Sequence, residues 1–140
     1  VLVAARPPLV AFNLELESPA TVADAKRIAA LIREGGEEGL PGLRAIGLGL
    51  EQQGGVAQVS CNIEDHRAVP LARLVEAVGR HAKVRRCELV GLLPQAALDG
   101  LPDDLEITNL ATIEEALASA GLAPPAEPAR SGVRPGLPSL

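Results

Sequence analysis

The sequence predicts an α+β domain whose elements follow one another in the order β-α-β-β-α-β. Three observations predict it. Three segments alternate apolar and polar residues with the period of a strand, two carry apolar residues at helical spacing, and an apolar run follows the second of these. The 140 residues are enough for one domain with its own core. Because the chain has one Phe and no Met, Trp or Tyr, this core must be built from Leu, Val, Ile and Ala.

The first strand is predicted over residues 9–17. Val10, Phe12, Leu14 and Leu16 share one side there, and Ala11, Asn13, Glu15 and Glu17 share the other, so one face is apolar and the other wet. The stretch from Ser18 to Thr21 supplies N-cap residues and an early proline, which favour a helix start. We expect an amphipathic helix from there to about Glu34, where two glycines end it.

Residues 43–53 and 56–63 are predicted to form a hairpin. Gly54-Gly55 would supply the positive φ angles that a tight two-residue turn requires. The return strand alternates, so Gln58, Ser60 and Asn62 share its polar side. On the outgoing strand we expect Ala45, Gly47 and Gly49 to lie on that same side of the sheet.

The second half repeats the alternation of helix and strand. A helix is predicted from Pro70, with Leu71, Leu74, Val75, Val78 and Ala82 on one stripe, and a last strand over residues 87–93. After a short helical turn at 95–100, residues 112–120 are predicted as a helix capped by Thr108 or Asn109, with Ile113, Ala116 and Leu117 inward. Residues 121–140 are rich in proline and poor in apolar side chains, which predicts a disordered tail.

This order is that of the ferredoxin-like split β-α-β unit. It predicts an antiparallel sheet with strand order 4-1-3-2 over residues 9–120. Both helices would cover one face of the sheet, and the first and third strands would lie in its middle. The second face would be left open.

Charge and composition argue against several classes of protein. The chain has 13 basic and 18 acidic residues, a net charge of −5, so no basic excess exists to bind a nucleic-acid backbone. One Phe is too few for an aromatic platform that stacks bases. No apolar stretch reaches about 18 residues without a break, and no signal pattern is present, so we expect no membrane span and a cytoplasmic location. A chain that begins at Val1 is expected to be a piece of a longer product.

Cys61 and Cys87 form no CxxC motif and have no histidine at ligand spacing, so we expect no metal site. Both lie in apolar runs, which predicts buried free thiols. We interpret His66 as a solvated loop residue rather than an acid or base, and His81 as a residue at a helix C-terminus. No complete catalytic constellation is evident.

The polar side of the two central strands is the most informative feature. Asn13 and Glu15 lie there beside Gln58, Ser60 and Asn62, whose neutral amides and hydroxyl donate and accept hydrogen bonds. Two interpretations remain open: an ordinary solvated face, or a surface that binds a planar polar ligand or a second domain. The scarcity of Lys, Thr and Arg on this face favours a site.

Three strings, in order and at suitable separations, resemble the C-terminal subdomain of the glutamate formimidoyltransferase family. Residues 5–14 carry Ala-Arg followed by LVAFNL, which is similar to the entry of that subdomain. Residues 57–62 (AQVSCN) resemble its AQVSxN strand, and residues 88–94 (ELVGLLP) resemble its LVGL.P strand and exit. The resemblance covers about residues 4–120.

The resemblance implies an enzyme that moves a formimidoyl group from N-formimidoyl-L-glutamate to tetrahydrofolate, its co-substrate, in histidine degradation. It implies that residues 1–8 link this subdomain to an N-terminal subdomain, that ligands lie between the two sheets, and that the full enzyme is a homodimer. Asn13, Gln58, Ser60 and Asn62 would line the site. Gly91 would allow close approach, and Arg6 could meet a carboxylate.

The resemblance implies that the catalytic histidine belongs to the N-terminal subdomain, which we expect to lie outside these 140 residues. We therefore expect the chain alone to bind and orient ligands without catalysing the reaction. Ala4 stands where the family usually has a glycine. Two alternatives stay open: a non-catalytic ferredoxin-like module that pairs through the same face, and a relative that salvages formylated folates.

Overall fold

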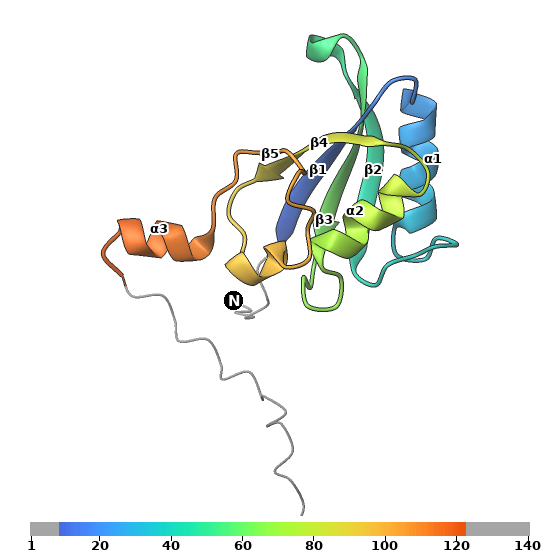
Figure 1. The fold of residues 1–140 in the computed structure, drawn as a ribbon. Coiled ribbons are helices and arrows are strands. Elements are labelled where there is room, and N and C mark those ends of the chain that lie inside the picture. Colours follow the sequence, from blue (N-terminus) through green and yellow to red (C-terminus); the bar gives the residue numbers. More distant parts are fainter. Residues whose placement is uncertain (1–8, 123–140) are drawn as a thin grey trace, which may run out of the picture.

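A five-stranded sheet in the order β2-β3-β1-β4-β5 organises the computed structural model, which describes residues 9–122 (Figure 1). Its strands are β1 (Val10–Leu16), β2 (Leu43–Leu50), β3 (Val56–Ile63), β4 (Val84–Val90) and β5 (Ile107–Thr108). The first four are antiparallel and have the predicted order 4-1-3-2, with β1 and β3 in the middle. β5 pairs in parallel with β4, so the sheet is mixed. Sequence reasoning missed β5 because two residues show no alternation.

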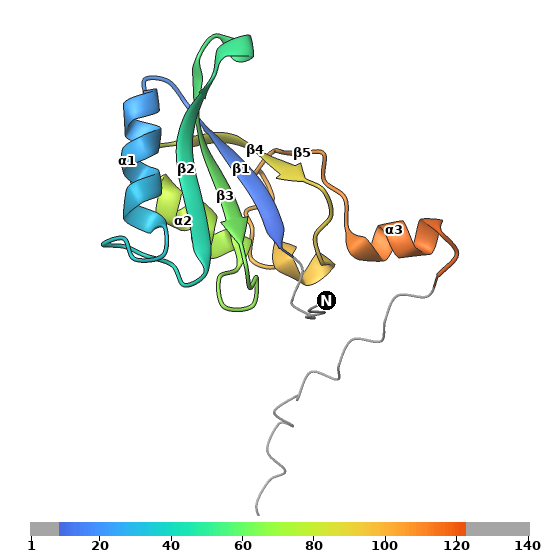
Figure 2. The ribbon, with the colours of Figure 1, turned by 180° about the vertical axis from the view of Figure 1, so that it is seen from behind.

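The helices α1 (Val22–Ile32) and α2 (Leu71–Gly79) cover one face of this sheet, and no helix in the described part of the chain covers the other, which we call the open face (Figures 1 and 2). A capping box begins α1: the Thr21 hydroxyl accepts from the Asp24 N–H, and the Asp24 carboxylate accepts from the Thr21 N–H. Alternate residues of β1 fill the layer between sheet and helices, and Phe12 is fully buried among them. The aliphatic core and the buried phenylalanine are as predicted.

The turn between β2 and β3 is longer than predicted. β2 ends at Leu50, and a short 3-10 helix, η1 (Glu51–Gln53), precedes the two glycines. Gly54 and Gly55 both have positive φ, as expected, but they end a five-residue connection between Leu50 and its partner Val56. The predicted two-residue turn is therefore wrong.

The side of β2 that faces the helices is also the reverse of the prediction. Ala45 is buried, and a Cβ at Gly47 would collide with the backbone of Ala25 and Lys26 in α1. A Cβ at Gly49 would lie 2.8 Å from Cγ2 of Val22. These small residues therefore let α1 approach β2 closely, and the larger side chains of β2 lie on the open face.

The last predicted strand began three residues too late. β4 starts at Val84 and ends at Val90, and Gly91 follows with a φ of 86° that ends the extended conformation. The prediction left Arg85 and Arg86 outside the strand, but Arg86 pairs with Glu15 across the sheet. A short 3-10 helix, η2 (Gln95–Leu98), follows as predicted.

The helix α3 (Ile113–Ser119) begins at Thr112, whose hydroxyl accepts from the Glu115 N–H in a second capping box. The predicted caps Thr108 and Asn109 are wrong. Thr112 also forms an isolated β-bridge with Leu93. Because α3 starts directly after this bridge, it begins beyond the sheet and extends away from it (Figure 1). It has no buried residue, and Ala116 is exposed, so the predicted inward packing is wrong.

The predictions for residues 1–8 and for residues 123–140 lie outside the described residues. Within residues 9–122, no helix has the length and apolar character needed to cross a membrane.

The contact between Gly47 and α1 generates a stability prediction. Gly47→Ala should lower the free energy of unfolding by about 3 kcal/mol, because the added methyl displaces helix backbone rather than a side chain. Gly79→Ala is the matched control: nothing lies within 4 Å of its Cβ position, so we expect no loss of stability. Urea unfolding measures both, and equal midpoints would contradict the close approach of α1 to β2.

Candidate functional site: the open sheet face

The open face carries three rows of side chains set by the strand register. The first row is Leu48, Gln58, Glu15 and Arg86; the second is Ile46, Ser60, Asn13 and Glu88; the third is Arg44, Asn62, Ala11 and Val90. Each row runs across β2, β3, β1 and β4 in that order. The amides of β1 and β3 therefore lie between two different strands. On one side is β2, with two apolar side chains and one arginine, and on the other is β4, with Arg86 and Glu88.

The second row is connected by hydrogen bonds. The Ser60 hydroxyl donates to Oδ1 of Asn13 at 2.8 Å, and Nδ2 of Asn13 donates to Oε1 of Glu88 at 3.4 Å. All three side chains are half-buried. At the β2 end of the row, Ile46 is 61% exposed. A ligand on this face would thus meet an ordered polar row with an apolar side chain beside it.

In the first row, Glu15 of β1 and Arg86 of β4 form an ion pair. Nε of Arg86 donates to Oε2 of Glu15 at 2.7 Å, and Nη2 of Arg86 donates to Oε1 of Gln53 at 3.3 Å. The hydrogen bond and the charge of Glu15 raise the pKa of Arg86 above its already high ordinary value. Glu15 and Gln58 are buried. Since Gln53 belongs to η1, this hydrogen bond joins the β2–β3 connection to β4 at this end of the face.

The opposite end of the face is apolar along β1 and β4. Ala11 lies opposite Val90, and the exposed fractions of Leu9, Val90 and Leu92 are 46%, 52% and 45%. We call Leu9, Ala11, Val90 and Leu92 the apolar end. Exposed aliphatic groups grouped beside a polar row are typical of a surface that another molecule covers.

The structure brings together four of the six predicted site residues. Asn13 and Ser60 are hydrogen-bonded to each other in the second row. Gln58 lies next to them in the first row, and Asn62 lies in the third row. Gly91 follows β4, with nothing within 4 Å of a Cβ placed there. Arg6 lies outside the described residues.

Sequence reasoning placed neither Arg86 nor Glu88 in the site. Because the last strand was predicted to begin at Cys87, Arg86 fell in a loop and the alternation of Arg86, Glu88 and Val90 was not recognised. This alternation is the signal that could have found them, since it matches the polar side of β1 position by position.

Neither histidine lies in the three rows. His66 follows β3, is 9% exposed and has no hydrogen-bond partner for Nδ1, so the prediction of a solvated loop residue is wrong. His81 lies beyond the end of α2, where its Nε2 is 2.8 Å from Oε2 of Glu38. No group of residues within 9–122 has the composition and spacing of a metal site.

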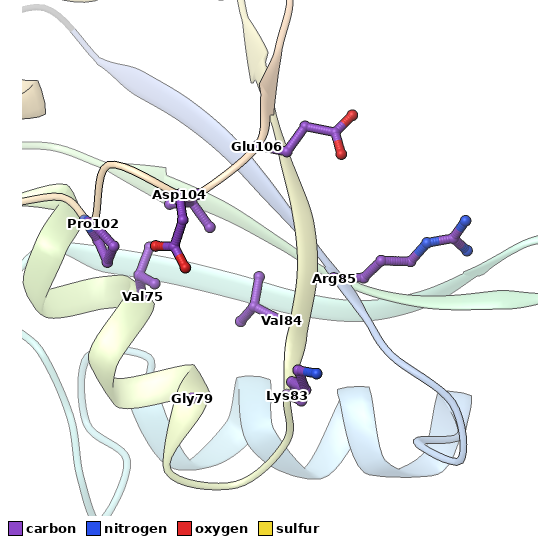
Figure 3. Close-up of a pocket in the computed structure, with 9 residues that line it drawn as sticks. Val75, Gly79, Lys83, Val84, Arg85, Pro102, Asp104 and Glu106 are labelled. Atoms are coloured by element: carbon purple, nitrogen blue, oxygen red, sulfur yellow. The ribbon is translucent and has the colours of Figure 1, made fainter.

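A hollow of about 270 Å³ lies away from the open face, between α2, β4 and the segment before β5 (Figure 3). Val75 and Val84 line it with Asp104, while Arg85 and Glu106 extend away from them (Figure 3). None of the residues in the three rows lines this hollow. It is therefore separate from the candidate site.

The two thiols belong to the core. Cys61 pairs with Phe12, and Cys87 pairs with Leu14, so one thiol lies on each side of β1. Both are buried and free, as predicted. Burial raises the pKa of each thiol to about 12.

An antiparallel four-stranded core sheet with helices on one face and a hydrogen-bonded polar row on the other defines a ferredoxin-like domain with an accessible sheet face. The family model for the formiminotransferase domain matches residues 11–115. The chain therefore belongs to the formiminotransferase domain family, as the three strings indicated. No curated protein matches the chain.

The buried thiols predict both reactivity and pH dependence. An aromatic disulfide reagent at pH 8 should modify neither Cys61 nor Cys87 in the native protein, and both in urea. In the unfolded chain a thiol ionises near 9.0, whereas the native pKa is about 12. The thiols therefore favour the native state below pH 9, and this contribution is lost as the pH rises from 9 towards 12.

The double variant Cys61→Ala, Cys87→Ala tests the cause, because the chain contains no tyrosine that would titrate in the same range. Its stability should fall less steeply above pH 9 than that of the unmodified protein, measured by urea unfolding at a series of pH values. Rapid modification of either thiol in the native protein would contradict the assignment.

Proposed function

We propose that this domain supplies the folate- and substrate-binding half of a formimidoyltransferase. The reaction moves a formimidoyl group from N-formimidoyl-L-glutamate to tetrahydrofolate, a step of histidine degradation in the cytoplasm. The observation that carries the proposal is the open face with its second row of Ser60, Asn13 and Glu88, which hydrogen bonds hold in order and which no helix within residues 9–122 covers. Membership of the formiminotransferase family supports the class of reaction.

The chemistry of the open face suits the ring of tetrahydrofolate. Tetrahydrofolate, the co-substrate, carries a ring edge of alternating N–H donors and acceptors, and amides and hydroxyls match such an edge without a fixed charge. Asn13, Ser60 and Asn62 present these groups, and Ile46 supplies apolar contact. None of these open-face residues is aromatic. We therefore expect any aromatic side chain that stacks on the folate ring to belong to the subdomain that covers this face.

The proposed enzyme is completed by a second subdomain. An N-terminal subdomain would cover the open face and pack against the apolar end. It would also supply the histidine that transfers a proton. The apolar end supports this arrangement, because its leucines and valine lose contact with water when covered. Binding and orientation belong to the present chain, proton transfer to the other half, and the whole enzyme is proposed as a homodimer.

The same apolar end favours one further candidate function, a non-catalytic module that pairs through its sheet. Light scattering after size exclusion separates the two proposals. A stable dimer formed through this face and indifferent to folate would favour pairing alone.

The site predicts the effect of truncating its amides. In the full-length protein that contains this chain, Asn13→Ala should weaken tetrahydrofolate binding about tenfold, since a lost hydrogen bond in a covered site costs about 1–3 kcal/mol. Gln58→Ala should also weaken it. Gln95→Ala is the matched control, because this exposed amide lies in η2 and outside the three rows.

Isothermal titration with tetrahydrofolate under reducing conditions measures the three affinities. Unchanged affinity in both Asn13→Ala and Gln58→Ala would show that the ligand binds elsewhere.

A further inference from the structure

Glu88 holds a formal negative charge at the β4 end of the second row of the open face. It lies opposite Asn13 on one side and level with Thr108 of β5 on the other. Its Oε1 accepts from Asn13 at 3.4 Å, and within residues 9–122 no basic side chain forms an ion pair with it. Arg86, two residues earlier on the same side of β4, is held by Glu15 at 2.7 Å. Glu88 contributes to the negative charge around Arg86, but within residues 9–122 its carboxylate has no ion-pair partner of its own.

Ser60 determines what Asn13 presents to Glu88. Because the Ser60 hydroxyl donates to Oδ1 of Asn13, the amide is oriented with Nδ2 towards β4. Asn13 thus fixes one oxygen of Glu88 with a weak neutral bond, and Oε2 accepts no hydrogen bond from any described residue. An ionised carboxylate offers about four acceptor positions, so most of its capacity is unused.

Covering this face would remove water from Glu88. A desolvated carboxylate is stable only when a cation or strong paired donors replace the lost water. The group that fits a carboxylate best is planar and presents two parallel N–H donors from a single N–C–N unit, as a guanidinium does. A carboxylate of the ligand placed next to Glu88 would instead be repelled, so the carboxylates of a ligand must lie away from this position.

We propose that Glu88 binds a planar N–C–N group through two N–H donors, and that Ser60 and Asn13 position it for this task. The inference rests on the proposed function for its two natural sources of such a group. One is the protonated amidine of a formimidoyl donor, and the other is the aminopyrimidinone edge of a reduced folate. In the first case Glu88 distinguishes a formimidoyl donor from a formyl donor, which lacks the second N–H and the charge.

The test compares Glu88→Gln with Glu76→Gln in the full-length protein that contains this chain. Glu76 is the matched control, because it lies on α2 in the helix layer, where its carboxylate pairs with Arg80 at 3.7 Å. Titration calorimetry uses four ligands: N-formimidoyl-L-glutamate, N-formyl-L-glutamate, tetrahydrofolate and benzamidine. The last is a simple planar amidinium that belongs to neither substrate.

If the amidine is the source, Glu88→Gln weakens N-formimidoyl-L-glutamate and benzamidine at least tenfold and leaves N-formyl-L-glutamate within twofold. If the folate edge is the source, tetrahydrofolate weakens tenfold instead. Either outcome supports the inference, and Glu76→Gln should change none of the affinities. All four affinities within twofold of the unmodified protein would overturn it.

The failure of the proposed function gives a different result. An unmodified protein that binds neither tetrahydrofolate nor the two glutamates overturns the proposed function. The benzamidine arm then decides the inference by itself: binding that Glu88→Gln abolishes supports it, and no binding to the unmodified protein overturns it.

Discussion

The two-sided pairing of β1 is the constraint on which the rest of the structure depends. β1 hydrogen-bonds to β3 along one edge and to β4 along the other, so it is held in one register. Because side chains alternate along a strand, this register buries Phe12 and Leu14 beneath the helices and brings Asn13 and Glu15 to the opposite face. A slip of one residue would move the polar side chains into the core. Core and site are therefore determined by the same hydrogen bonds.

The prediction of the fold succeeded where alternation distinguishes the two faces, as in β1 and β3. It failed on β2, where glycines alternate with leucines and an isoleucine. Hydrophobicity alone would bury the larger residues, but Gly47 lies against the backbone of α1 and leaves no room for a side chain. Ile46 therefore lies on the open face. The requirement that a helix backbone approach a strand acts between distant segments and leaves no local pattern in the sequence.

The residues of the candidate site were likewise predictable only where apolar and polar side chains alternate clearly. Asn13 and Ser60 follow directly from alternation, and their hydrogen bond confirms that they share a face. Glu88 lay within the predicted strand but was not placed on the open face, whereas Arg86 was missed because the strand was predicted to begin at Cys87. Arg86 belongs to the strand because Glu15 on β1 pairs with its charge, an interaction between residues 71 positions apart. The start of β4 therefore depends on a contact with a distant carboxylate, which local alternation does not show.

The three rows also impose a direction on any molecule that covers the sheet. The first row is already neutralised internally by Arg86 and Glu15 and is reached by η1, so it accepts little further charge. The second row ends on β4 in Glu88, which has no ion-pair partner within residues 9–122, and beyond the third row lies the apolar end. For the ligand and the subdomain proposed above, N–H donors over Glu88 and an apolar rim over the apolar end would be satisfied together in one orientation. The reverse orientation would place the donors over Ile46 at the β2 end of the same row.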